Sequence, residues 1–157
     1  MIRKISASDS ELLAQIHGRC FGKGWSAESF RDMLLADKVF FGFAHEIDSG
    51  GEAVGFILCK AVCEEAEIVT FGVLPHFRNI GVGGNLVRKA EEEAEMRSAA
   101  IVFLEVSRDN ATARKLYENL GYEAIAKRRG YYKTEGGAQD ATVMRKNLFG
   151  GRISPGS

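Results

Sequence analysis

Residues Val69 to Gly84 read VTFGVLPHFRNIGVGG, and they join a strand to a helix through a glycine-rich bend. The apolar run before the bend, Ile68 to Leu74, predicts a strand that Pro75 ends. Apolar residues at helical spacing after it predict an amphipathic helix over Gly81 to Arg97. Such a bend exposes unpaired backbone N–H groups at the positive end of a helix, and both features bind phosphate oxygens. The stretch therefore indicates an anion site at the turn of an α/β unit.

The spacing of the glycines excludes two common phosphate loops. Gly81 and Gly83 let the backbone approach a pyrophosphate without a Cβ in the way, and Arg78 can supply positive charge. The bend is not a Walker loop, because no Gly-Lys-Ser/Thr ends it, and Leu86 occupies the third glycine position of the dinucleotide fingerprint. Taken alone, it fits a plain strand-to-helix turn equally well.

The remaining pattern predicts one domain over residues 1–149, followed by a tail over 150–157. Helices are expected after a cap at Ser8 or Asp9, after a cap at Ser26 with Trp25 stapled to Phe30, and from Asn110 to Leu120 with Gly121 in the left-handed conformation. Strands are expected over Val39–Ile47, Ala53–Val62, Ala99–Val106, Tyr122–Lys127 and Asp140–Lys146, and residues 48–51 suit a hairpin connection.

Composition and charge exclude several classes of protein. The chain has 157 residues, and its 21 basic side chains balance its 21 acidic ones, so no basic excess indicates a nucleic-acid or membrane partner. No signal-peptide pattern or membrane-length apolar run is present, and we expect a cytoplasmic protein. Cys59 and Cys63 are expected in the core rather than in a zinc site, because no second ligand pair follows them. We therefore expect no metal.

Two further residues can carry chemistry. Glu105 follows the run Ile101 to Leu104, and alternation places it on the same face as Ile101 and Phe103. It lies at the carboxyl end of a strand expected to be parallel, the edge where ligands gather in α/β sheets. A carboxylate there can act as a general base, although an exposed glutamate at a strand end fits the pattern equally well. Tyr117 lies on the apolar face of its helix and, on the pattern alone, is more typical of a core tyrosine.

Together these stretches resemble the GNAT superfamily of acetyltransferases. Arg78 to Gly83 matches its Gln/Arg-x-x-Gly-x-Gly/Ala signature, and Asn110 to Tyr122 matches its Asn-x-x-Ala-x-x-Leu-Tyr-x-x-x-Gly-Phe/Tyr segment. The resemblance implies an α+β fold with a mixed, mostly antiparallel, twisted central sheet, helices on both faces, and parallel strands splayed at the cofactor site. It implies acetyl-coenzyme A as cosubstrate, bound by Phe71, Gly72, Val73, Arg78, Asn79, Gly81, Val82, Gly83, Gly84 and Asn110. A backbone N–H around Phe71 to Val73 would stabilise the oxyanion, and Gly72 would permit a bulge there.

Within the superfamily the chain looks most like the RimI type, which acetylates the N-terminal alanine of a small-subunit ribosomal protein. The similar stretches are Trp25 to Phe30, Phe103 to Val106, Lys127 to Tyr132 and Asp140 to Met144. The resemblance implies Glu105 as general base and Tyr117 as general acid. Trp25, Arg128, Tyr131 and Tyr132 would then bind the protein N-terminus. The sequence departs from the pattern at Ile80 and Lys133, and a monomer or weak homodimer is expected.

Two other functions stay open on the sequence. An acetyltransferase for a small amine or a lysine side chain would share the same cofactor half. Trp25 lines the substrate groove or merely staples its helix, and Arg128, Tyr131 and Tyr132 are equally compatible with a solvated strand end, so the substrate half does not decide. A non-catalytic coenzyme A-binding sensor is the alternative outside the enzymes, and the pairing of Glu105 with Tyr117 argues against it.

Overall fold

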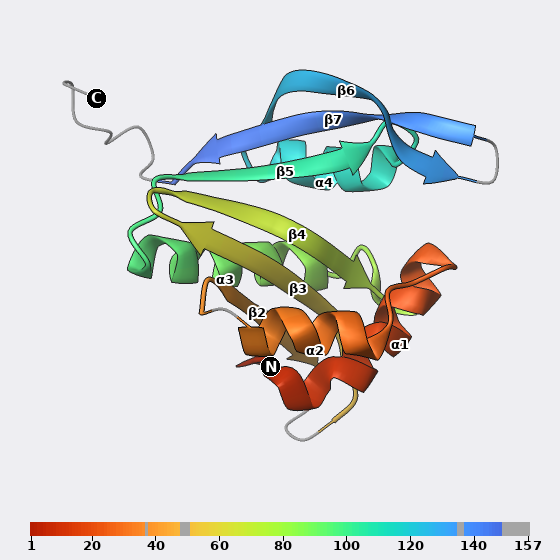
Figure 1. Ribbon diagram of the computed structural model, residues 1–157, viewed down its shortest axis with the longest axis vertical. Coiled ribbons are helices and arrows are strands. Elements are labelled where there is room, and N and C mark those ends of the chain that lie inside the picture. The colour runs from red at the N-terminus through yellow and green to blue at the C-terminus, as the bar shows by residue number, and fades with distance from the viewer. Residues whose placement is uncertain (37, 48–50, 135–136, 149–157) are drawn as a thin grey trace.

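The computed structural model describes residues 1–36, 38–47, 51–134 and 137–148, with the backbone alone described over 129–134 and 137–139. The chain forms a twisted sheet with helices on both of its faces (Figure 1). Its strands are β1 (Ile2–Lys4), β2 (Phe40–Glu46), β3 (Ala53–Val62), β4 (Glu65–Val73), β5 (Ile101–Ser107), β6 (Glu123–Thr134) and β7 (Gly137–Asn147). Its helices are α1 (Ser10–Phe21), α2 (Ala27–Ala36), α3 (Val82–Met96) and α4 (Ala111–Asn119), with short 3-10 turns η1 (Ala7–Asp9) and η2 (Pro75–Phe77).

The order of the strands across the sheet is β1-β2-β3-β4-β5-β7-β6. Neighbouring strands pair antiparallel except β4 and β5, which are parallel. The paired residues of β4 and β5 run from Glu65 and Ile101 to Ile68 and Leu104, although both strands continue beyond. The two strands therefore part over their carboxyl-terminal halves, as Figure 1 shows. This confirms the predicted mixed sheet with splayed parallel strands.

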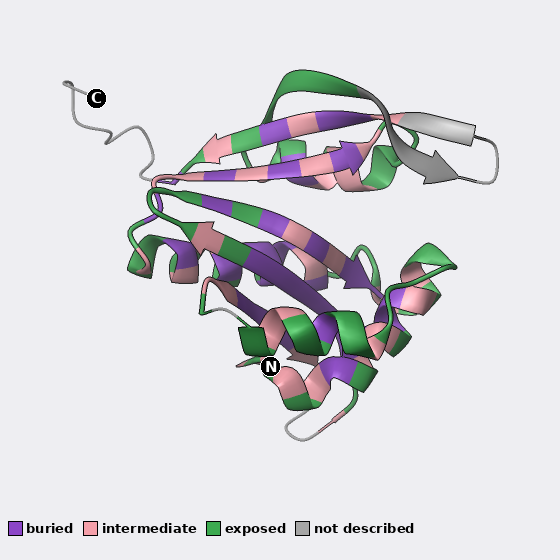
Figure 2. Cartoon of the chain, viewed as in Figure 1, coloured by how far each residue is buried: buried purple, intermediate pink, exposed green. Residues whose placement is uncertain are grey.

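Two apolar clusters hold the helices to the sheet. On one face α3 and α4 pack on a cluster that contains Leu86, Val87, Leu104 and Tyr117. On the other face α1 and α2 cover a cluster centred on Phe30 and Phe56. The buried residues follow the covered parts of the sheet, whereas β6 is exposed along Glu123 to Arg128 (Figure 2). The α1/α2 face is therefore open over β5, β7 and β6.

Several local predictions are confirmed by the structure. The Asn110 side chain accepts a hydrogen bond of 3.1 Å from the Ala113 N–H and caps α4, and Gly121 after that helix has φ of 99°. Ser26 accepts from the Ser29 N–H at 3.1 Å, and the Trp25 and Phe30 rings lie 5.6 Å apart, as expected for a capped and stapled α2.

Pairing between strands distant in the sequence makes some elements differ from those predicted. Strand β1 was not expected, and β4 begins at Glu65, three residues earlier than the apolar run indicates. Asp9, one of the two predicted capping residues, is the N-cap residue of α1, but its side chain makes no capping hydrogen bond to that helix and pairs instead with Arg3 of β1 at 3.0 Å. Strands β2 and β3 are antiparallel as predicted, but the turn residues 48–50 lie outside the described residues.

The bulge expected at Gly72 lies elsewhere. Gly72 pairs in register with Phe56, and the register of β3 and β4 shifts instead between Leu58 and Cys59. A Cβ at Gly72 would lie 3.0 Å from the Cys20 sulfur. Glycine at position 72 therefore allows α1 to pack closely against β4, and it does not mark a bulge.

Candidate active site at the gap between β4 and β5

The end of β4 is fixed to the loop that follows it. The Val73 carbonyl accepts a hydrogen bond of 2.8 Å from Arg78 Nε and one of 3.4 Å from Cys20 Sγ. Arg78 thus turns back onto the strand that precedes its loop. Half-burial raises the pKa of the Cys20 thiol, and the nearby Arg78 opposes that rise. These contacts fix the position of β4 where it has left β5.

The loop into α3 needs glycine at two positions for different reasons. Gly81 precedes the helix with φ of 95°, a conformation that favours glycine, and Asn79 also has a positive φ of 66°. A Cβ at Gly83 would lie 3.0 Å from Phe71 Cζ and 3.2 Å from Leu116 Cδ2. Gly83 therefore lets the first turn of α3 pack against β4 and α4.

The exposed residues of this loop, Arg78 to Gly81, are followed by the N-terminus of α3. A helix of 15 residues presents unpaired N–H groups and a positive end there, which suits phosphate oxygens. The structure brings this loop next to Phe71, through the contact at Gly83. The predicted cofactor residues on β4 and on the loop thus surround one end of the gap. The Asn110 side chain, in contrast, caps α4.

Glu105 lies just beyond the point where β4 and β5 part. Val102, Leu104 and Val106 are buried in the α3/α4 cluster, so alternation directs Glu105 to the α1/α2 face. Its side chain is 17% exposed, and its Oε1 accepts a hydrogen bond from Arg128 Nη1 of β6 in an ion pair. Sequence reasoning identified both residues but not their contact, which depends on the register of β6 beside β7.

A second carboxylate lies near Glu105 on the same face. Glu67 of β4 pairs in register with Phe103, two residues before Glu105. The pKa of Glu67 is raised, first by partial burial and then by the negative charge of Glu105, while Lys60 and Arg128 oppose the rise. Glu67 is not among the residues predicted from the sequence, because only the pairing of β4 with β5 makes it a neighbour of Glu105.

Tyr117 approaches the gap from the opposite face. The residue is 5% exposed, and its ring lies 6.1 Å from the Phe71 ring and 5.7 Å from the Tyr122 ring, measured between centroids. Tyr122 donates a hydrogen bond of 2.8 Å to Glu91 of α3, and Lys146 of β7 lies 3.0 Å from the same carboxylate. Burial and the Glu91 charge raise the pKa of Tyr122. Glu105 and Tyr117 therefore flank the parted strands from the two faces of the sheet.

Comparison with known proteins agrees with this geometry. Residues 10–122 match the acetyltransferase (GNAT) family. The chain belongs to the GNAT acetyltransferases. This GNAT protein is 29% identical over 143 residues to the ribosomal protein bS18-alanine N-acetyltransferase of Escherichia coli K12, covering 91% of this chain and 94% of that protein.

Solved structures show the same fold. The crystal structure of the ribosomal-protein-S18-alanine N-acetyltransferase from Escherichia coli superposes with a TM-score of 0.85 at 28% identity, covering 94% of this chain and 93% of that one. Arabidopsis thaliana NAA60 in complex with acetyl-CoA has a TM-score of 0.81 at 22% identity, covering 94% and 97%. At 22% identity, the similarity to NAA60 shows a common fold only.

The substrate residues predicted for this GNAT protein are described in part. Trp25 is 39% exposed, and its ring stacks on the His17 ring with 4.9 Å between centroids. The backbone N–H of Trp25 donates a hydrogen bond of 3.0 Å to His17 Nδ1. Burial lowers the pKa of His17 to about 4. His17, to which the sequence assigned no role, thus holds the start of α2 in place. The side chains of Tyr131 and Tyr132 lie outside the described residues.

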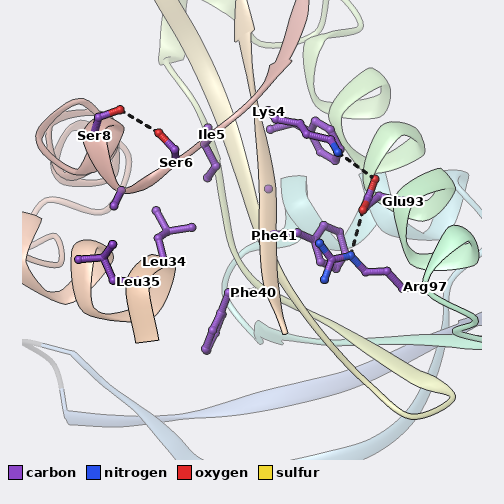
Figure 3. A pocket seen from close by; sticks show the side chains of 13 residues that line it. Lys4, Ile5, Ser6, Ser8, Leu34, Leu35, Phe40, Phe41, Glu93 and Arg97 are labelled. Atoms are coloured by element: carbon purple, nitrogen blue, oxygen red, sulfur yellow. Dashed lines mark hydrogen bonds and ion pairs between the residues drawn. The ribbon is translucent and has the colours of Figure 1, made fainter. Parts of the chain in front are cut away.

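A separate pocket of about 430 Å³ lies at the far edge of the sheet. It is lined by β1, β2, α2 and the last turns of α3, where Glu93 pairs with Arg97 at 3.0 Å (Figure 3). The 15 residues of α3 span about 22 Å, and the predicted phosphate loop lies at the other end of that helix. None of the predicted site residues lines this pocket, so we assign it no part in the reaction.

The cysteines and the described helices bear on metal binding and on membrane-spanning segments. Cys59 is buried as predicted, whereas the core position expected for Cys63 is wrong, because Cys63 is exposed in the turn between β3 and β4. Over the described part of the chain, no cluster of three His, Cys, Asp or Glu side chains is arranged to bind a metal. Among the same residues, no helix has both the length and the apolar character needed to cross a membrane.

Proposed function

We propose that this GNAT protein transfers the acetyl group of acetyl-coenzyme A to the α-amino group of a protein N-terminus, namely the N-terminal alanine of a small-subunit ribosomal protein in the cytoplasm. The observation that carries the proposal is the position of Glu105, a mostly buried carboxylate at the point where β4 and β5 part. The names of the Escherichia coli relatives support the choice of substrate.

The reaction needs a neutral amine, and a free α-amino group with a pKa of about 7.7 to 8.0 is mostly protonated at pH 7. Glu105 accepts a proton from the substrate ammonium, directly or through a water molecule, on the open α1/α2 face. The amine nitrogen then forms a bond to the thioester carbonyl carbon and releases its second proton to solvent as the carbon–sulfur bond breaks. Tyr117, on the other face, donates its phenolic proton to the departing thiolate and regains a proton from solvent.

Backbone groups complete the proposed site. Beyond Ile68, β4 is no longer paired with β5 but stays paired with β3, so a peptide N–H around Phe71 to Val73 that points toward β5 can stabilise the oxyanion. The residues that would hold acetyl-coenzyme A are Phe71, Gly72, Val73, Arg78, Asn79, Gly81, Val82, Gly83, Gly84 and Asn110. The positive φ at Gly81 and the tight packing at Gly83 fit a loop that brings backbone N–H groups close to a pyrophosphate. Trp25, Arg128, Tyr131 and Tyr132 would contact the protein substrate.

Mass spectrometry of an acetylation reaction tests the proposal. The full-length protein is incubated with isotope-labelled acetyl-coenzyme A and with ribosomal proteins that carry free N-termini. We expect label on the α-amino group of one small-subunit protein that begins with alanine. Label confined to lysine side chains, or absent from every protein while small amines become acetylated, would contradict the N-terminal assignment. Binding of acetyl-coenzyme A without any turnover would favour the non-catalytic sensor.

A further inference from the structure

A polar network of Tyr122, Glu91 and Lys146 lies next to Tyr117 in the mainly apolar α3/α4 cluster. Tyr122 is 3% exposed and donates its hydrogen bond of 2.8 Å to Glu91 of α3. The Lys146 ammonium of β7 lies 3.0 and 3.1 Å from the two oxygens of the same carboxylate. The side chains of Glu91 and Lys146 are 12% and 25% exposed, so both charges are largely removed from water. One carboxylate therefore joins α3, β7 and the chain that follows α4.

Packing alone gives no reason for charges at this position. Val87, Ala90 and Ala94, which precede and follow Glu91 on α3, are buried against the sheet. Removing a carboxylate and an ammonium from water is costly, and apolar residues of similar size in place of such a pair often leave stability unchanged or raise it. A hydrophobic pair would thus hold α3 to β7 equally well. What the ion pair supplies in addition is a fixed acceptor for the Tyr122 hydroxyl.

The Tyr122 ring is in turn a direct neighbour of Tyr117. The planes of the two rings make an angle of 64° at 5.7 Å between centroids, which is an edge-to-face contact. The backbone N–H of Tyr122 also donates a hydrogen bond of 2.9 Å to the Tyr117 carbonyl. The other ring in contact with Tyr117 is that of Phe71, which carries no polar group. Of the two flanking rings, only Tyr122 can therefore be held in one orientation by a hydrogen bond.

The helix that carries Tyr117 gives that residue little support of its own. Helix α4 has nine residues and is about 13 Å long, and Tyr117 is its one buried residue. Proton donation requires the Tyr117 hydroxyl to point at the departing sulfur, and a displacement of about 1 Å in a catalytic group can lower a rate strongly. The orientation of the hydroxyl therefore depends on the rings that contact Tyr117.

From this arrangement we infer that Glu91, Lys146 and Tyr122 are positioning residues, which act on the reaction through Tyr117. Lys146 fixes the Glu91 carboxylate, and that carboxylate fixes the hydroxyl end of the Tyr122 ring. The Tyr122 ring then keeps the Tyr117 hydroxyl directed at the gap between β4 and β5. The inference rests on the proposed function, because it concerns the acid of that reaction.

Kinetics of an apolar version of the network separate positioning from stability. Tyr122→Phe removes the hydroxyl and keeps the ring, and the triple variant with Glu91→Met and Lys146→Met also replaces the ion pair by side chains of similar size. Both variants should lower kcat about three- to thirty-fold, with the KM values for acetyl-coenzyme A and an alanine-first peptide within about twofold. The triple variant should keep its Tm, because apolar packing replaces the ion pair. Unchanged kcat in both variants would overturn the inference.

The matched control replaces another ion pair of the same helix. Glu93, also 12% exposed, pairs with Arg97 at 3.0 Å beside the far pocket. Glu93→Met with Arg97→Met should leave kcat within about twofold of the unaltered protein, because this pair does not act through Tyr117. An equal fall of kcat in this control and in the triple variant would attribute the effect to α3 as a whole and contradict the inference.

A double-mutant cycle tests whether the effect passes through Tyr117. Tyr117→Phe already lacks the acid, so Tyr122→Phe added to it should lower kcat by less than about twofold further. The same loss with and without the Tyr117 hydroxyl would show that the network acts on another group, and the inference would fall.

Failure of the proposed function is a different result. If the unaltered protein acetylates only lysine side chains or small amines, the same variants are compared with that acceptor, because the acid serves any amine. If it acetylates no acceptor, fluorine NMR with fluorotyrosine in place of Tyr117 reports the orientation of the ring directly. One sharp resonance in the parent and a split or broadened one after Tyr122→Phe would support the positioning role, whereas identical spectra would contradict it.

Discussion

Replacing Glu105 with glutamine separates catalysis from folding more cleanly than other changes in the site. The substitution keeps the size of the side chain and removes its charge and its ability to accept a proton. A positioned general base contributes about 10² to 10⁴ in rate. We therefore expect kcat to fall by about that factor, equal to roughly 3 to 5 kcal/mol of activation free energy.

The cost in stability should be far smaller. Glu105→Gln breaks the ion pair with Arg128, whose side chain is 52% exposed, and such pairs contribute about 0 to 1 kcal/mol. For a chain of 157 residues that corresponds to a change in Tm of at most about 4 °C. The fold around Glu105 relies on Val102, Leu104 and Val106, which the substitution leaves in place.

The assay follows coenzyme A release at saturating acetyl-coenzyme A with an alanine-first peptide, alongside thermal unfolding followed by circular dichroism. Glu123→Gln is the control, since it removes an exposed carboxylate of β6, in the same sheet. Turnover of Glu105→Gln within about threefold of the unaltered protein would refute its role as base. A fall in Tm above 10 °C that parallels the lost activity would refute the separation of catalysis from folding.

Three further predictions concern the other face, the loop and the α1–α2 connection. Tyr117→Phe, which removes only the phenolic hydroxyl, should lower kcat about 10- to 1,000-fold. Its affinity for acetyl-coenzyme A by calorimetry should be unchanged, and full activity would exclude Tyr117 as the acid. Gly83→Ala should be about 1 to 2 kcal/mol less stable than Gly84→Ala in urea unfolding. The reason is that a Cβ at Gly83 would lie 3.0 Å from Phe71, whereas a Cβ at Gly84 would lie 3.5 Å from its nearest neighbour. Equal stabilities of the two variants would contradict the packing described for the loop. His17 is held neutral in the fold with a pKa of about 4, below its usual 6.5, so its contribution to stability is complete above about pH 6.5 and is lost as the pH falls toward 4, by up to about 3 kcal/mol. Urea unfolding of His17→Gln should depend less on pH across that window, and an unchanged slope would count against the assignment.

The features that the sequence predicts well are those determined by neighbours along the chain. The cap at Asn110, the left-handed Gly121 and the glycine bend before α3 each depend on a few adjacent residues, and all three are present in the structure. The alternation that directs Glu105 away from the core is likewise local. These features, together with the matched motifs, were enough for the fold.

Features that depend on pairing between distant strands could not be predicted in this way. Strand β1 has three residues and exists because Ile2 to Lys4 pair with the edge of β2. Because β1 forms there, the side chain of Asp9 pairs with Arg3 rather than with a backbone N–H of α1, although Asp9 remains the N-cap residue of that helix. Glu67 and the ion pair of Arg128 with Glu105 follow from the registers of β4, β6 and β7, which no short stretch of sequence encodes.

The separation of β4 from β5 beyond Ile68 bears on how such an enzyme can diversify. Peptide N–H groups exposed by this fork exist whatever side chains occupy Phe71 to Val73, proline excepted. Under the proposed mechanism, a lineage can therefore exchange its titratable residues and its acceptor pocket one at a time while the topology continues to supply oxyanion stabilisation. On that mechanism, a variant with poor acid and base groups would retain part of the activity, from which new acceptor specificities could be selected.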